Sequence, residues 1–163
     1  MVLSGSDHWT LEDGTRHPTG YWAEEFVVPH NGFRTQGVEA VVATPGAVAP
    51  TVDQRSLDPE MAGGARRATA FRDYLDAIAT DLARPTVLQH AVGHVAGYDA
   101  IYLPGGHGPM EDLAGFPPLG ELLVRCFDTG DGPALGAARR GGRHPAHRPE
   151  PGVVPGGHRP DAE

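Results

Sequence analysis

The chain lacks lysine altogether, so all 13 of its basic residues are arginines, against 21 acidic residues and a formal charge of −8. An acidic chain without a basic stripe is not typical of a nucleic-acid-binding protein. No apolar run approaches the roughly 20 residues that a membrane-spanning helix needs. The first residues carry neither the basic region nor the apolar stretch of a signal peptide. We therefore expect a cytoplasmic protein with neither nucleic acid nor a membrane as a partner.

Cysteine is nearly absent too, because Cys126 is the single one, and this excludes an internal disulfide framework. We expect Cys126 to be a small buried apolar residue rather than a reactive thiol. Metal ligands are equally sparse. His90 and His94 are four residues apart, the spacing of one helical face, but the sequence offers no third ligand nearby, and His144 and His147 share this weakness. We expect no metal and no cofactor.

Short apolar runs alternate with helical patterns up to about residue 130. Phe71, Leu75, Ile78 and Leu82 recur at steps of three and four, which predicts a helix over 66–83. The other predicted helices are 21–36, with Pro29 as a kink or a fresh turn, and 119–128, with Leu119, Leu122, Leu123 and Phe127 facing inward. Strands are predicted at 2–4, 38–44 and 100–103, and loops at 6–19 and 46–64. This alternation is typical of an α/β fold with a mainly parallel sheet.

The segment 98–108 is the most informative part of the chain. A buried strand ends at Pro104, which cannot donate a ladder hydrogen bond. Gly105, Gly106 and Gly108 then allow the backbone to approach another group closely. Ligands of open α/β sheets bind just beyond the carboxyl ends of strands, so a site is predicted here. A dinucleotide fingerprint is excluded, because Glu111 stands where the third glycine is needed.

Two other segments are not predicted to be functional sites. Ser6, Asp7 and His8 are the residue types of a hydrolytic triad, but neighbours in sequence point apart, so we expect no relay. Residues 131–163 contain seven glycines and six prolines and show no helical or strand period. Such a segment cannot bury enough apolar surface to offset its ordering entropy, so we predict a disordered Gly/Pro/Arg-rich tail.

With these residues in view, the chain resembles the ThiJ/PfpI family of the class I glutamine amidotransferase-like superfamily, in its Hsp31-like chaperone and glyoxalase III branch. The resemblance rests on segments 18–25, 43–46, 98–108 and 110–113, and on Pro29, Phe33 and Gly37. It covers about residues 2–130, so 1–130 is expected to be a partial domain of this family and 131–163 the tail. The implied fold is a flavodoxin-like three-layer α/β sandwich with a mainly parallel sheet, incomplete at the C-terminus.

Members of the family use a cysteine nucleophile followed directly by histidine at a strand-to-helix elbow, with a glutamate of the first helix beside the thiol. The resemblance assigns this acid–base glutamate to Glu25, with Glu24 as the alternative. It assigns the backbone N–H groups of Gly105 and Gly106 to a developing oxyanion. His107 either orients the substrate or is a solvated loop residue. The implied substrates are small reactive carbonyl compounds such as methylglyoxal, and a homodimer is possible because members of the family often pair.

The sequence departs from the family pattern where the nucleophile is expected. An apolar strand and then Cys-His should follow the helix that stops at Gly130, but 131–140 contains no cysteine, and Cys126 comes too early to take its place. We hypothesise a shift of reading frame near residue 130, which resequencing of the locus would test. The sequence thus predicts an ancestrally cysteine-dependent glyoxalase III, deglycase or hydrolase whose present copy is inactive. The alternative is a non-catalytic stress-response or chaperone-like binding protein.

Overall fold

The computed structural model describes residues 1–128 and 134–137, which form a mixed α/β structure. Its strands are β1 (His8–Thr10), β2 (Arg16–Pro18), β3 (Ala43–Thr44), β4 (Thr86–Val87), β5 (Ala100–Leu103) and β6 (Ala134–Ala137). Its α-helices are α1 (Ala23–Thr35), α2 (Pro59–Ala62), α3 (Ala65–Ala77), α4 (Ala79–Leu82), α5 (Leu88–Gly93), α6 (Gly108–Asp112) and α7 (Pro117–Asp128). Short 3₁₀ turns are η1 (Pro45–Ala47), η2 (Gln54–Leu57) and η3 (Val95–Gly97).

Two parallel strand pairs, β3–β4 and β5–β6, are joined by the first residues of the chain. The N–H of Val2 donates to the carbonyl of Tyr102 in β5, and the N–H of Leu3 donates to the carbonyl of Ala43 in β3, both over 2.9 Å. Hydrogen bonds therefore run from β4 through β3 and Val2–Leu3 to β5 and β6. From Val2–Leu3 the chain adds β3 and then β4 on one side, and it later adds β5 and then β6 on the other side. Ligands of α/β sheets bind at the point where the strand order reverses in this way.

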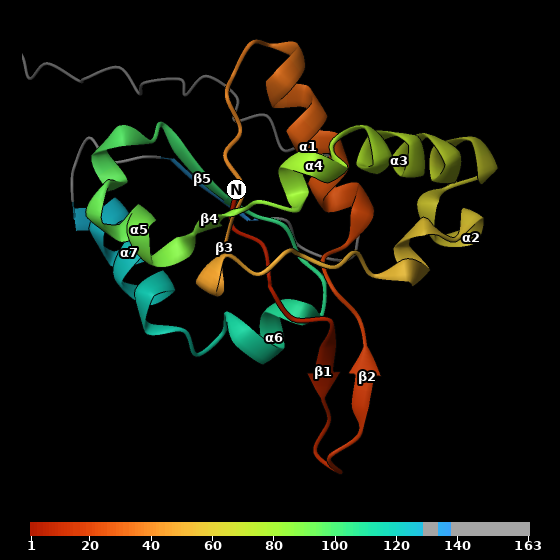
Figure 1. Cartoon of the computed structure of the whole chain (residues 1–163), viewed down its shortest axis with the longest axis horizontal. Coiled ribbons are helices and arrows are strands. Elements are labelled where there is room, and N and C mark those ends of the chain that lie inside the picture. Colours follow the sequence, from red (N-terminus) through yellow and green to blue (C-terminus); the bar gives the residue numbers. More distant parts are fainter. Residues whose placement is uncertain (129–133, 138–163) are drawn as a thin grey trace, which may run out of the picture.

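Apolar side chains form two clusters, on different sides of these strands. Helices α5 and α7 lie to the left of the strands in Figure 1, and α1, α3 and α4 lie to the right. Phe26 of α1 and Phe71 of α3 are central to one cluster, and Leu88 of α5 and Leu122 of α7 to the other. Val2 belongs to one cluster and Leu3 to the other, so this first segment of the chain, Val2–Leu3, is part of the core. No helix among residues 1–128 and 134–137 is long and apolar enough to cross a bilayer.

The strand at 100–103 and the helix that ends at Asp128 confirm the sequence prediction. Helix α1 also forms, and it continues through Pro29, whose missing N–H would otherwise donate to the carbonyl of Glu25. The strand predicted at 38–44 is reduced to Ala43–Thr44. The helix predicted at 66–83 divides at Ile78, whose φ of −111° ends α3, although this side chain stays buried and continues the apolar stripe.

Four predictions were wrong. The loop expected at 6–19 contains the antiparallel hairpin β1–β2. The loop expected at 46–64 contains the 3₁₀ turn η2 and the helix α2. The side chain of Phe127 is 72% exposed rather than inward-facing, because Cys126 takes the buried position on that side of α7. A strand, β6, lies after Gly130, where we predicted none, and it is paired along its whole length with β5. The remainder of the predicted tail, 131–133 and 138–163, lies outside the described residues.

Candidate functional site

The structure brings Glu25 and the glycine turn together. Glu25 lies in the first turn of α1, and its Oε2 accepts a hydrogen bond of 2.6 Å from the N–H of Gly105, eighty residues later. The N–H of Trp22, which precedes α1, donates to the carbonyl of Gly105 over 2.9 Å. Burial and the charge of Glu25 both raise the pKa of Tyr102, so this hydroxyl belongs to the same environment. The alternative carboxylate, Glu24, forms a surface ion pair with Arg67 instead.

The backbone of the glycine turn lies antiparallel to the segment that enters α1, with Gly106 opposite Tyr21. Gly106 has a φ of +136°, and a Cβ there would lie only 2.2 Å from the carbonyl oxygen of Gly20. A side chain at this position is therefore excluded by both backbone conformation and space. This close approach holds Gly105 within reach of the Glu25 carboxylate.

The start of α1 is fixed by two buried polar residues, Asp53 directly before η2 and Ser56 within it. The Ser56 hydroxyl accepts a hydrogen bond from the N–H of Ala23 (2.9 Å) and donates to the carbonyl of Asp53 (2.5 Å). The Asp53 carboxylate accepts from the hydroxyl of Thr19 (2.8 Å) and from the N–H of Arg55 (3.0 Å). Sequence reasoning missed Asp53 and Ser56, although the unusual length of the loop predicted at 46–64 was a signal of function.

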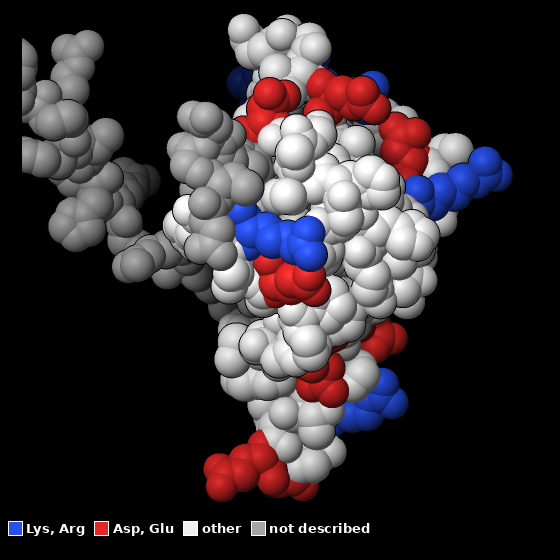
Figure 2. Space-filling model, turned by 90° about the vertical axis from the view of Figure 1, so that its left-hand side faces the viewer, with Lys and Arg blue, Asp and Glu red and all other residues white. Residues whose placement is uncertain are grey.

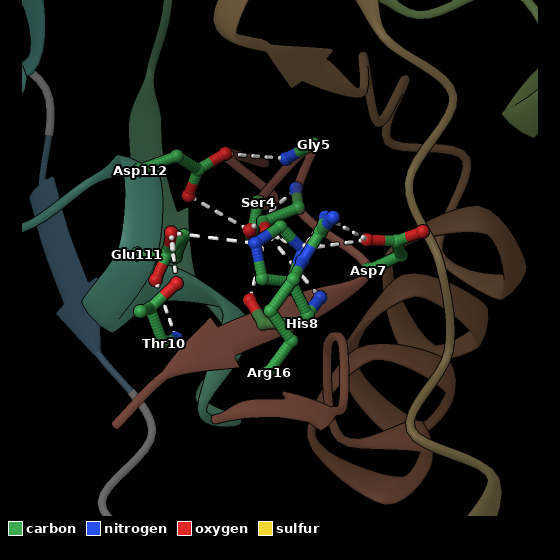
Figure 3. A network of polar contacts seen from close by, with 9 residues as sticks. Ser4, Gly5, Asp7, His8, Thr10, Arg16, Glu111 and Asp112 are labelled. Atoms are coloured by element: carbon green, nitrogen blue, oxygen red, sulfur yellow. Dashed lines mark hydrogen bonds and ion pairs between the residues drawn. The ribbon is translucent and has the colours of Figure 1, made fainter. Parts of the chain in front are cut away.

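Asp112 of α6 holds the backbone that follows the first segment, Val2–Leu3. Its Oδ1 accepts a hydrogen bond from the Ser4 hydroxyl and its Oδ2 accepts one from the N–H of Gly5, each over 2.7 Å. Figure 3 shows these bonds beside the network around His8. Because α6 begins directly after the glycine turn, Asp112 ties the two strand ends that flank the site. This residue was quoted in the family resemblance but was assigned no role.

Ser6, Asp7 and His8 do contact one another, so our reason for rejecting a triad was wrong. The His8 Nδ1 lies 2.7 Å from Asp7 Oδ1 and 3.4 Å from Ser6 Oγ. A relay needs the hydroxyl and the carboxylate on different ring nitrogens, and here both face Nδ1. The other nitrogen, Nε2, lies 3.4 Å from Glu111 Oε1. The hydrogen bond with His8 lowers the pKa of Asp7.

His107 follows the glycine turn and is partly buried among aromatic rings. The indole of Trp9 stacks on its imidazole at 5.5 Å between centroids and 8° between planes. The ring of His17 lies edge-on to it at 6.5 Å. His107 is therefore not the fully solvated loop residue of our alternative reading, and its role toward a substrate stays a prediction.

The remaining candidates lie away from Glu25 or outside the described residues. Cys126 is 7% exposed in the α5–α7 cluster, and burial raises the pKa of its thiol, as expected of an inert apolar residue. His94 Nδ1 lies 2.9 Å from the carbonyl of His90, and residues 1–128 contain no group of three or more acidic, histidine or cysteine side chains arranged for a metal. His144, His147 and the segment 138–140 fall outside the described part of the chain.

Two solved structures are similar in fold to this chain. No protein-family model and no curated protein matches this sequence. The crystallographic structure of APC35852 is 31% identical, with a TM-score of 0.59, over 84% of this chain and 53% of that one. Glyoxalase III from Candida albicans is 21% identical, with a TM-score of 0.62, over 83% of this chain and 54% of that one. The chain thus shares the fold of glyoxalase III and spans about half the length of both structures.

Proposed function

We propose that this chain is built on the scaffold of a ThiJ/PfpI-family, glyoxalase III-like protein and that it is catalytically inactive as written. The observation that carries the proposal is the hydrogen bond between the Gly105 N–H and the Glu25 carboxylate. It joins the two motifs of the family resemblance at the reversal point of the parallel strands. The likeness in fold to glyoxalase III supports the same conclusion.

In this proposal Glu25 is the acid–base group for a small carbonyl substrate. The bond from Gly105 fixes the carboxyl through Oε2, which leaves Oε1 to exchange a proton with the substrate. The Gly105 N–H would have to release Glu25 before it could bind an oxyanion, so Gly106 is the first candidate of the turn for that role. His107, adjacent to it, orients the substrate.

The nucleophile is the missing part. Strand β6 ends at Ala137, which pairs with Leu103 at the end of β5. The sequence continues with Ala138 and Arg139, where the family pattern has a cysteine and a histidine. Without a thiolate, an oriented carboxyl and backbone donors have no attacking group to assist.

We also propose that the fold is the doubly wound, three-layer, flavodoxin-like sandwich implied by the resemblance. The parallel pairing of β3–β4 and β5–β6 around the first segment supports it. So does the division of the core between α1–α3 and α5–α7. The shift of reading frame near residue 130 remains a hypothesis for resequencing.

Methylglyoxal consumption tests the proposal. The heat-unfolded chain is the control for direct reaction of the aldehyde with arginine. We expect no turnover by the chain as written and turnover by an Ala138→Cys/Arg139→His double variant, which Glu25→Gln removes. Turnover by the unchanged chain that survives Cys126→Ser would refute the need for the absent cysteine.

The second candidate is a non-catalytic, chaperone-like binding protein. Val124 and Phe127 of α7 are 57% and 72% exposed. Figure 2 shows the side of the molecule that carries α5 and α7, where uncharged surface surrounds scattered charged residues. Suppression of aggregation of an unfolded client, weakened by Phe127→Ser and occurring without methylglyoxal turnover, would favour this candidate.

A further inference from the structure

Three aromatic and imidazole rings from two distant segments gather beside the glycine turn. Trp9 of β1 and His17 of β2 are directly opposite each other in the hairpin. Both contact His107, Trp9 by parallel stacking and His17 edge-on. We call Trp9, His17 and His107 the ring cluster. It unites residues for which the sequence offered no common role.

The hairpin that carries two of these rings is fixed to α6 by one carboxylate. Glu111 accepts hydrogen bonds from both the N–H (2.8 Å) and the hydroxyl (2.9 Å) of Thr10. The His8 Nε2 lies 3.4 Å from the same carboxylate. Figure 3 shows these groups converging from β1 and α6. Because α6 begins directly after His107, these contacts of Glu111 fix the rings of Trp9 and His17 relative to the ring of His107.

The ring cluster lies a short distance from Glu25. Gly105, which binds the Glu25 carboxylate, is two residues before His107 in the chain. Two residues of backbone span at most about 7 Å. The Glu25 carboxylate and the ring cluster are therefore held by neighbouring residues of one glycine turn.

We propose that the ring cluster is a recognition wall for short planar carbonyl compounds bound at Glu25, with Trp9 and His17 as specificity-determining residues. This inference rests on the proposed function of the Glu25 site. One face of the Trp9 indole stacks on His107, so a planar sp² group would stack on the opposite face. Imidazole N–H groups donate to carbonyl oxygens. Because Glu111 already fixes the hairpin that carries Trp9 and His17, binding of the compound costs less conformational entropy.

Titration of the full chain with hydroxyacetone, a short carbonyl compound without an aldehyde, tests the wall without any need for turnover. The signals are the Gly105 amide and the Trp9 indole N–H in ¹H–¹⁵N spectra. We expect both to follow one binding curve. Trp9→Ala should weaken binding about fivefold, the size of an aromatic contact. Trp9→Leu, which keeps an apolar side chain in the hairpin, should weaken it similarly, and Trp9→Phe should restore most of it.

The control is Val38→Ala, which shortens an exposed apolar side chain between α1 and β3 and should leave the affinity unchanged. A Gly105 response with unaltered affinity in Trp9→Leu would overturn the wall and leave the Glu25 site standing. A response of Trp9 without Gly105 would likewise overturn it, because binding would then be separate from Glu25. No response of either signal would reject the carbonyl site itself and the wall with it.

Discussion

Replacing Gly106 by alanine should destabilise the chain more than its single methyl group suggests. The new Cβ would lie 2.2 Å from the Gly20 carbonyl oxygen and 3.0 Å from the Cα of Tyr21, so backbone must separate from backbone. The φ of +136° adds about 1–3 kcal/mol for any residue other than glycine. Separation also strains the bond from Trp22 to Gly105, worth about 1 kcal/mol. The sum is about 3 kcal/mol.

For a chain of 163 residues this corresponds to a midpoint of thermal unfolding lower by about 6–12 °C. Thermal unfolding followed by circular dichroism measures it. Gly120→Ala is the matched control, because Gly120 lies within α7 and a Cβ there meets nothing within 4 Å. That variant should raise the midpoint slightly, since alanine favours a helix by roughly 0.5–1 kcal/mol over glycine. Equal midpoints for both variants would refute the close approach of the glycine turn to the entry of α1.

Three further predictions concern the support of the site, pH and the thiol. Ser56→Ala should cost about 1–2 kcal/mol in urea unfolding, because it removes the partner of the Ala23 N–H; an unchanged midpoint would contradict this role. Burial, followed by the charge of Arg34, lowers the pKa of His30, so the unfolded chain binds more protons below pH about 6.5. Stability should therefore fall as pH drops from 7 to 5, less steeply in His30→Gln; equal slopes would exclude this cause. The thiol of Cys126 should react slowly with Ellman's reagent until urea unfolds the chain, and rapid reaction of the native chain would show that it is not buried.

Local sequence patterns were sufficient to predict an element that consists of an apolar run and ends at proline or glycine. The apolar run before Pro104 and the glycines after it located β5 and its turn without error. Patterns failed in the hairpin, because strands of three residues, His8–Thr10 and Arg16–Pro18, are too short to show a clear period. That hairpin is closed by local hydrogen bonds around Asp13 and Gly14, and it is also held by contacts with α6, about a hundred residues later.

The site could be predicted only in part for a related reason. Glu25 and Gly105 were found because each belongs to a recognisable motif, and their hydrogen bond then joined the two. Asp53, Ser56 and Asp112 were missed because short polar residues in loops and at helix ends carry no period. Asp53 and Ser56 are buried, and Ser56 and Asp112 accept hydrogen bonds from backbone far away in the sequence, which a single sequence does not express.

The central place of the first segment has a consequence for how this chain acquires its structure during synthesis. Val2 and Leu3 must wait for β3, and then for β5, before their ladder is complete on both sides. The hydrogen bond between Ser4 and Asp112 joins residues that are 108 positions apart in the sequence. Contacts of such long range slow folding. A ribosome-bound chain halted before β5 emerges should therefore expose the segment Val2–Leu3 to proteases, and one halted after α7 emerges should protect it.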